Sequence, residues 1–174
     1  MQKKICILII LFLILSAFLP IFSTFSYQKI KILFKVDSNN ISIFENNEEK
    51  TIEVNYPVII KNNRSLVEAY LFLKTDFFNG SFDANFDGSQ KEVTYYFSDD
   101  HKNSLVIAVN YAKNTAKAYF NDEEIMMDVV PYQPTMTDQM MMASHFILPI
   151  RLIFETFGYT VEWNNETREI TVYK

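Results

Sequence analysis

The amino-acid sequence predicts an α+β fold of two ββαββ repeats, in which antiparallel sheets are each packed on a short helix. Runs of alternating apolar and polar residues, typical of half-buried strands, recur along the chain. Two segments, near residues 66–74 and 150–157, have instead the spacing of an amphipathic helix. A pair of strand-like runs stands before and after each of these segments, so the same unit is predicted twice.

The helix predicted over residues 150–157 has the clearest signals in the chain. Apolar residues recur at i, i+3, i+4 and i+7 from Ile150 to Phe157, which gives the helix one apolar stripe. Pro149 stands at its start, where a missing N–H is tolerated. Gly158 follows its last turn as a C-terminal cap.

Strands are predicted wherever apolar and polar residues alternate. In chain order they lie at 30–36, 41–44, 51–54, 82–86, 93–97, 105–109, 115–120, 125–129, 159–163 and 170–172. The polar turn 164–167 between the last two suits a hairpin. Since a lone hairpin is only marginally stable in water, we expect the four strands of each repeat to bury their apolar faces over one helix.

The boundaries of the two repeats follow from aligning the halves of the chain. Residues 66–71 align with 147–152 at an offset of 81, whereas the following hairpins align at an offset of 77. The first copy therefore carries extra residues after its helix. We predict a first, degenerate repeat at residues 27–100 and a second, better-matched repeat at residues 104–174.

The N-terminal residues 1–26 form a separate segment. Lys3 and Lys4 precede an apolar run over residues 5–22, and small polar residues follow, an order typical of a secretory signal peptide. Pro20 breaks this run near the expected cleavage position. A run of this length also approaches the shortest membrane span, so the segment is predicted to be a signal peptide or an N-terminal membrane anchor. Either places the rest of the chain outside the cytoplasm, secreted or associated with the cell envelope.

The charge balance and the histidine count exclude several functions. The formal net charge is −5, and an acidic surface repels the phosphate backbone of nucleic acid. The single cysteine, Cys6, lies in the N-terminal segment, so the exported part has no thiol chemistry. Neither His101 nor His145 has a Ser or Cys partner in a recognisable motif. We therefore predict no catalytic residue, no cofactor and no enzymatic activity.

Methionine is dense over residues 126–145. Thioethers are soft ligands that suit Cu(I) outside the cytoplasm, although methionine also fills gaps in cores and loops. This segment is therefore an alternative site, for an extracytoplasmic metal-handling protein. Its candidate ligands are Met136, Met140, Met141, Met142 and His145.

A second candidate metal site resembles the start of an EF-hand calcium loop. Asp83, Asn85 and Asp87 occupy positions 1, 3 and 5 of such a loop. Position 12 is Thr94, where the loop needs a bidentate Glu. Aligning the two halves of the chain instead places these residues at the end of a strand and in the turn of a hairpin. We favour this interpretation.

The chain has more aromatic residues than are needed to fill the core beneath a small helix. Exposed rings could stack on sugars or seat a partner protein, whereas buried rings would fill the core or the seam between the repeats. We expect most of them to be buried. The residues in question are Phe77, Phe78, Tyr95, Tyr96 and Tyr111.

The second repeat resembles a known family. An apolar pair, then Pro149, an apolar residue and Arg151, a helix closed by Gly158, and Trp163 followed by Asn164 are similar to the signature of repeats related to the N-terminal domain of copper amine oxidases. In bacterial exported proteins these repeats are often called stalk domains. The resemblance implies an antiparallel sheet on a helix and a non-catalytic role. It also implies an architectural function for four signature residues, Pro149, Arg151, Gly158 and Trp163.

The first repeat departs from that signature. Glu68 stands in place of the proline, and Tyr70 in place of the arginine. The copper chemistry of the oxidases is not implied, since it belongs to a much larger domain with three histidine ligands, and this chain has two histidines.

These observations together predict a non-catalytic exported module of the cell envelope, with a binding or spacer role. Its expected partner is a cell-wall glycan or another exported protein, with no contact to nucleic acid and contact to the membrane only through residues 1–26. The alternatives are the metal-handling protein that uses residues 126–145 and a small hydrolase with a catalytic group assembled in space.

Overall fold

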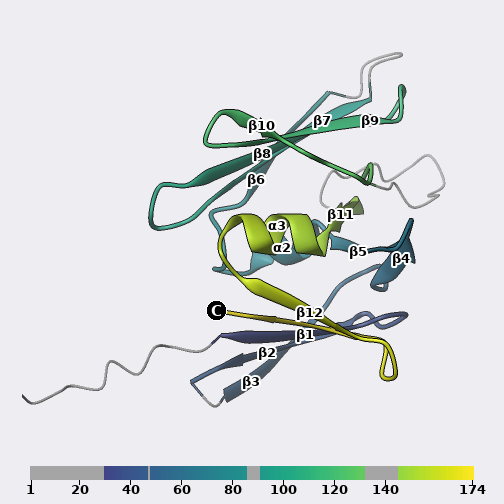
Figure 1. The fold of residues 1–174 in the computed structure, drawn as a ribbon, viewed down its shortest axis with the longest axis vertical. Helices are drawn as coiled ribbons and strands as arrows, with labels where there is room; N and C mark the ends of the chain where they lie inside the picture. Colours follow the sequence, from purple (N-terminus) through teal and green to yellow (C-terminus); the bar gives the residue numbers. More distant parts are fainter. Residues whose placement is uncertain (1–29, 47, 86–90, 132–144) are drawn as a thin grey trace, which may run out of the picture.

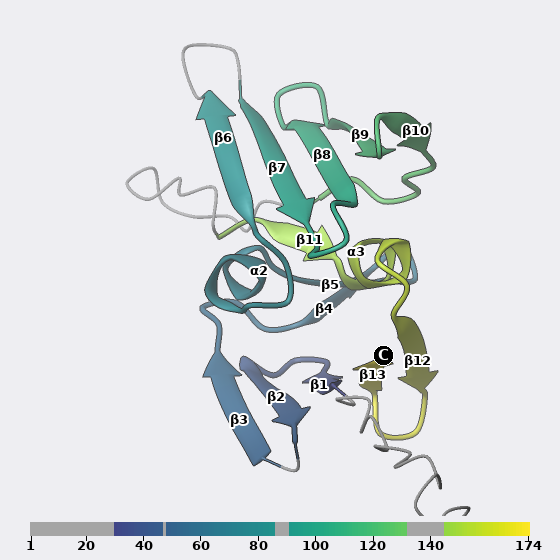
Figure 2. The same ribbon diagram turned by 90° about the vertical axis from the view of Figure 1, so that its left-hand side faces the viewer.

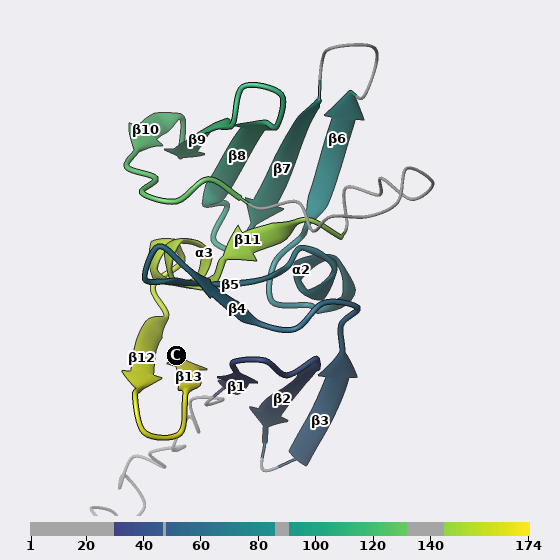
Figure 3. The same cartoon turned by 90° about the vertical axis from the view of Figure 1, so that its right-hand side faces the viewer.

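A computed structural model describes residues 30–46, 48–85, 91–131 and 145–174 of the chain. These residues form three antiparallel sheets and two short helices, α2 (Tyr70–Lys74) and α3 (Ile150–Thr156). Two five-stranded sheets form the outer layers, and the helices lie between them beside a three-stranded sheet (Figure 1). The views from the two sides show the same layers (Figures 2 and 3).

One five-stranded sheet, called the terminal sheet here, combines strands from the two ends of the described chain. Its order is β12-β13-β1-β2-β3. The strands are β1 (Lys31–Lys35), β2 (Asn40–Glu45), β3 (Glu48–Glu53), β12 (Thr160–Asn164) and β13 (Glu169–Tyr173). Alternate residues such as Ile32 and Phe34 are fully buried, because one face of the sheet covers the core and the other faces solvent.

The second five-stranded sheet, called the internal sheet, comes from one continuous part of the chain. Its order is β10-β9-β8-β7-β6. The strands are β6 (Ser81–Asn85), β7 (Glu92–Ser98), β8 (Ser104–Asn110), β9 (Thr115–Phe120) and β10 (Glu123–Ile125). Its inner face is lined by Tyr95 and Ile107, both fully buried, so the alternation predicted for these strands is present.

The small sheet has the order β11-β5-β4 and leads directly into both helices. Its strands are β4 (Ile59–Lys61), β5 (Arg64–Glu68) and β11 (Ile147–Pro149). β5 and β11 pair antiparallel around Val67 and Leu148. Because α2 begins two residues after β5 and α3 begins at the residue after β11, this pairing fixes the starts of the two helices beside each other.

The described residues thus form a mostly β fold with two short helices, and within them neither predicted ββαββ repeat forms a sheet of its own. The hairpin β12–β13, which follows α3, pairs with β1, and the hairpin β6–β7, which follows α2, pairs with β8. Each large sheet therefore takes strands from both predicted repeats. Alternation predicts which face of a strand is buried but does not name its partner strand, which is why the sequence could not predict this exchange.

The first predicted helix begins later than expected. Residues 66–68, assigned to the helix from their spacing, lie in β5, and α2 covers only Tyr70–Lys74. Leu66, Val67 and Glu68 are all buried, because β5 is the central strand of the small sheet. A short apolar run has no reliable period, and here its burial on both faces selected the strand.

Phenylalanine side chains from both helices and both large sheets meet in one core. The ring of Phe154 in α3 lies 5.6 Å from that of Phe72 in α2, and Phe72 lies 5.5 Å from Phe97 in the internal sheet. Phe34 of the terminal sheet lies 6.1 Å from Phe154. Phe72, Phe154 and Phe34 are fully buried, and burial of each such side chain stabilises the fold by about 1.5–3 kcal/mol.

The aromatic residues singled out from the sequence lie mostly in this core, as expected. Tyr95 and Phe78 are buried, and Phe77 and Tyr111 are partly buried against it. Tyr96 is the exception, with 42% of its surface exposed on the outer face of the internal sheet. Among the described residues, no helix is long and apolar enough to cross a bilayer, and residues 1–26 lie outside that part of the chain.

Candidate binding groove

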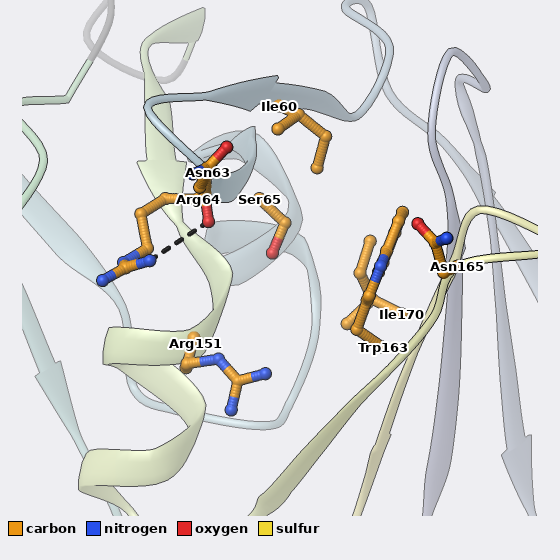
Figure 4. Close-up of a pocket in the computed structure, with 8 residues that line it drawn as sticks. All are labelled: Ile60, Asn63, Arg64, Ser65, Arg151, Trp163, Asn165 and Ile170. Carbon is orange, nitrogen blue, oxygen red and sulfur yellow. Dashed lines mark hydrogen bonds between the residues drawn. The ribbon is translucent and has the colours of Figure 1, made fainter.

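A groove of about 410 Å³ opens where the β4–β5 hairpin, the first turn of α3 and the β12–β13 hairpin meet (Figure 4). We call it the arginine groove. Its volume lies within the range of about 300–1,000 Å³ that is usual for small-molecule sites. It is lined by Ile60, Asn63, Arg64, Ser65, Arg151, Trp163, Asn165 and Ile170.

The β4–β5 hairpin forms one wall of the groove. Lys61 pairs with Arg64, so the loop consists of Asn62 and Asn63 alone. Both have positive φ, 51° and 58°, the conformation of a tight hairpin turn that asparagine tolerates better than most residues. Ile60 lies near this turn, beyond the core, and remains 43% exposed.

Arg64 is held at the groove by its neighbours. Its Nε donates a hydrogen bond of 2.6 Å to Oδ2 of Asp128, a second guanidinium nitrogen contacts the same carboxylate, and a third nitrogen donates to the carbonyl of Asn63. The Asp128 carboxylate raises the pKa of the Arg64 guanidinium above its ordinary value, through the hydrogen bond and the charge. Both side chains are largely exposed, so this pair adds little to stability.

Arg151, from the first turn of α3, forms the second cationic side of the groove. One of its terminal nitrogens donates to Oε1 of Glu155 at 2.5 Å, four residues along the helix. A guanidinium group carries five N–H donors, and within the described residues Glu155 is its only partner by hydrogen bond or ion pair. The remaining donors are available to a molecule in the groove.

The terminal hairpin supplies the aromatic wall. Trp163 pairs with Ile170 across β12 and β13. Ile170 is buried, but Trp163 lies near the end of its strand, past the edge of the core, and 42% of it is exposed. The turn that follows is fixed by Asn164, whose Oδ1 accepts hydrogen bonds from the backbone N–H of Glu166 and Thr167. Figure 4 shows the indole, Ile60 and the Arg151 guanidinium around one opening.

The lining of the groove is positively charged, although the chain is acidic overall. Two arginines line it and no Asp or Glu does, whereas the whole chain has a net charge of −5. Asp128 and Glu155 pair with these arginines from outside the lining. The Arg151 guanidinium is therefore the cation that an anionic group can reach beside the exposed indole and the isoleucine, since the Arg64 guanidinium is turned toward Asp128 (Figure 4).

Three of the four signature residues predicted from the sequence lie at the two ends of α3, and Trp163 lies in β12. Pro149 is the residue before the helix and Arg151 the second residue in it, while Gly158 follows its end with φ of 79°. No atom would obstruct a Cβ on Gly158, so its backbone conformation, which disfavours other residues, explains the glycine. Arg151 and Trp163 meet in the groove.

The candidate methionine site lies largely outside the described residues. Met136, Met140, Met141 and Met142 are not among them. Met126, at the start of the methionine-rich segment, is 87% exposed. Within residues 30–46, 48–85, 91–131 and 145–174, no group of three or more His, Cys, Asp or Glu side chains is placed to hold a metal ion.

The candidate calcium ligands are placed as the hairpin interpretation expects. Asp83 and Asn85 lie in β6, where they pair with Thr94 and Glu92 of β7. Asp87 lies outside the described residues.

A buried carboxylate that the sequence analysis did not single out as a site lies on the other side of the small sheet. Glu68 is fully buried and accepts hydrogen bonds from the backbone N–H of Asn55 at 2.6 Å and from its side-chain amide at 3.1 Å. Nδ1 of His145 lies 2.5 Å from Oε1 of Glu68. Tyr56 packs edge-on against the imidazole. The sequence signal for this cluster was Glu68, a charged residue directly after the apolar residues Leu66 and Val67 of β5.

This cluster is a structural clamp in its geometry. Glu68, Asn55 and His145 come from three separate segments, and the carboxylate joins them through its two oxygens. The described partners of His145 are Glu68, Asn55 and the Tyr56 ring, none of which is the Ser or Cys nucleophile that a hydrolase of the expected type needs.

A comparison with known families now places the chain. The described residues define a small domain with a layered, β-rich fold and an open groove. The copper amine oxidase N-terminal domain family matches residues 71–172, more than half of the chain. The chain belongs to this family of non-catalytic N-terminal domains, which confirms the resemblance, and the match includes no oxidase catalytic domain. No curated protein and no solved structure matches the chain.

Proposed function

We propose that this chain is a non-catalytic binding module of the cell envelope, exported by residues 1–26, which holds its ligand in the arginine groove. The ligand class is a cell-wall glycan or another exported protein. The charged and apolar N-terminal segment supports the location. Membership of a non-catalytic domain family supports a role in binding rather than in chemistry.

One observation carries the binding role in preference to a simple spacer. Ile60 and Trp163 are two of the most exposed large apolar side chains in the described chain, and both line the same concave surface as Arg64 and Arg151. Single exposed apolar residues are normal on protein surfaces and need no explanation. An indole, an isoleucine and the Arg151 guanidinium around one opening (Figure 4) match the composition of binding sites.

The test compares the purified full chain with two alanine variants for binding to isolated cell-envelope material. Trp163→Ala removes the aromatic wall, and we expect the affinity to fall about tenfold or more. Phe82→Ala is the matched control, since Phe82 is 41% exposed on the internal sheet, away from the groove. Retention by envelope material that is equal for all three proteins would reject the groove, and no retention of any would reject the binding role.

We also propose that the two halves are copies of one duplicated unit. The pairing of β5 with β11 supports this, because Val67 and Leu148, which are aligned residues of the two copies, lie opposite each other. The neighbouring pairs are then related by the same two-fold symmetry. They are Leu66 with Pro149 and Glu68 with Ile147.

The exchange of hairpins gives this duplication a test. If the copies are equivalent, residues 104–174 expressed alone should form a symmetric dimer, in which each β12–β13 hairpin pairs with β8 of the other copy. Size-exclusion chromatography with light scattering measures the mass. A folded monomer of this fragment would contradict the proposed equivalence.

A further inference from the structure

We infer that the arginine groove selects a sugar polymer that carries an anionic group, and that Glu155 competes with that group for Arg151. This inference rests on the proposed binding role and gives its ligand a chemical class. It combines three features of the groove: its charge, the shape and polarity of its walls, and the state of the Arg151 ion pair.

The charge of the groove favours an anion. Arg64 and Arg151 are its charged lining residues, and a guanidinium fork binds the oxygens of carboxylate or phosphate in pairs. Because the whole chain has a net charge of −5, a long polyanion such as nucleic acid is repelled by the remaining surface. A polymer whose anionic groups are spaced along a neutral backbone avoids most of this repulsion.

The walls of the groove favour sugar rings as the carrier of that anion. The exposed indole of Trp163 offers a flat apolar face on which the C–H face of a pyranose can stack. Asn63, Ser65 and Asn165 line the same opening with amide and hydroxyl groups, which exchange hydrogen bonds with sugar hydroxyls. An acidic peptide would satisfy Arg151 but would leave these polar groups and the indole less well matched.

The two arginines differ in how strongly they are already engaged. Arg64 contacts Asp128 through two nitrogens and the Asn63 carbonyl through a third. Arg151 has one partner among the described residues, Glu155, in an exposed pair within one helix. Exposed ion pairs of this kind are weak, so Arg151 is the arginine that a ligand can recruit, and Glu155 competes with the ligand for it.

Because Glu155 competes with the ligand, a mutation that removes the Glu155 charge should increase the affinity. A purely structural role of Arg151 does not predict such an increase. Glu155→Gln removes the competing charge without touching the groove lining. We expect the affinity for the anionic polymer to rise about two- to fivefold, the ratio that corresponds to an exposed ion pair. Arg151→Gln should lower the affinity about tenfold. Arg151→Lys keeps the charge but loses the guanidinium fork, so its affinity should lie between those of the unmutated chain and Arg151→Gln.

The experiment measures the affinity of the full chain for four probes by calorimetry at low ionic strength. Polygalacturonate in which most carboxylates are methyl-esterified carries spaced carboxylates on a neutral backbone, and a phosphate-bearing mannan carries the alternative anion. Dextran provides rings without charge, and polyglutamate provides charge without rings. We expect one of the anionic sugar polymers to bind most tightly, with an affinity that falls as salt rises, and the preferred polymer identifies the anion.

The groove variants then assign the binding to named side chains. Trp163→Ala should weaken binding of the anionic sugar polymer about tenfold and leave any weak binding of polyglutamate unchanged. Lys117→Gln is the matched control for Arg151→Gln, because Lys117 is also an exposed cation in an ion pair, with Glu124, but lies on the internal sheet. Circular dichroism of each variant confirms that it is folded.

The outcomes separate this inference from the proposed function. Dextran bound as tightly as the charged polymers, or polyglutamate bound most tightly, would overturn the inference, and retention by envelope material would still support the binding role. A decrease in affinity for Glu155→Gln would also overturn it. If no sugar polymer binds while envelope material retains the chain, the ligand is an exported protein and the inference fails alone.

Discussion

The terminal sheet and the internal sheet are built alike but only one of them borders the arginine groove. Each has three consecutive strands and a hairpin exchanged from the other half of the chain. In the terminal sheet, that hairpin places Trp163 opposite the first turn of α3 and its Arg151. In α2, the aligned position is Tyr70, whose ring lies 5.2 Å below Nζ of Lys74. Similar scaffolds therefore present different side chains at the starts of their helices.

The same contrast is seen where the two helices begin. Pro149 and Glu68 are aligned positions, and each lies at the end of its strand in the small sheet. Pro149 starts α3 without needing an N–H partner. Glu68 instead forms a buried polar clamp with Asn55 and His145. The first half of the chain thus uses this position to tie three segments together, while the second half keeps the family signature.

The largest expected effect tests whether the two sheets unfold together. Phe154→Ala removes a buried ring that contacts Phe34, Phe72 and Phe78, and we expect the free energy of unfolding to fall by about 3–5 kcal/mol. Because Phe72 also packs against Phe97 of the internal sheet, this cluster joins the two sheets, and denaturant unfolding followed by fluorescence and by circular dichroism should remain one transition. Two separate transitions in the unmutated chain would show that the sheets are independent units.

A smaller effect is expected where the copies differ at the small sheet. Glu68→Leu removes the buried carboxylate and leaves the backbone N–H of Asn55 and Nδ1 of His145 without this partner, so the free energy of unfolding should fall by about 2–4 kcal/mol. Glu68→Gln keeps one acceptor oxygen and should cost less. The measurement is guanidinium unfolding, with Glu155→Gln on the exposed face of α3 as the control. Equal stability of Glu68→Leu and the unmutated chain would remove the clamp from the description of the fold.

The third effect, on the free energy of unfolding, concerns the internal sheet. It is the smallest of the three near neutral pH and grows as the pH rises. Burial raises the pKa of Tyr95, helped by the neighbouring Tyr111, and burial also raises the pKa of Tyr111. Since both exceed the unfolded value of about 10, their contribution to stability is complete below pH 10 and is lost as the pH rises above it. Each tyrosine should reduce the free energy of unfolding by up to about 1.4 kcal/mol per pH unit.

The alkaline test compares unfolding at neutral pH and above pH 10 for Tyr95→Phe and for Tyr96→Phe. Tyr96 is exposed on the same strand and serves as the control. Tyr95→Phe should lose less stability in alkali than the unmutated chain, whereas Tyr96→Phe should follow it. Tyr159, beside the terminal sheet, has its pKa raised by burial too, so some alkaline loss should remain. Identical curves for both variants would reject the assignment to Tyr95.

Much of the strand content could be predicted from the sequence, because the signal is local. The runs at 93–97, 105–109 and 115–120 all lie in strands, since each has one buried and one solvated face. The helix predicted over 150–157 is α3, Ile150–Thr156. The partners of the exchanged hairpins were not predictable, because pairing depends on contacts between residues far apart in the chain.

The arginine groove was predictable only in part, and for the same reason. Arg151 and Trp163 stood out through the family signature, but Ile60 and Arg64 come from a hairpin that the sequence analysis did not predict. The adjacent pair Asn62 and Asn63, both with positive φ, was the local signal for that turn. This hairpin and α3 are far apart in the sequence, so the sequence did not show that their side chains line one groove.

The pairing of β1 with β13 determines how this domain would respond to tension. Lys31, at the start of β1, lies opposite Tyr173, at the end of β13. Force applied between residues 30 and 174 would therefore act on the same end of two neighbouring strands and open their hydrogen bonds one after another. Shearing would instead load all the bonds at once. The domain should thus be mechanically soft when it is pulled from both of these points, and it should tolerate a tether on one side far better.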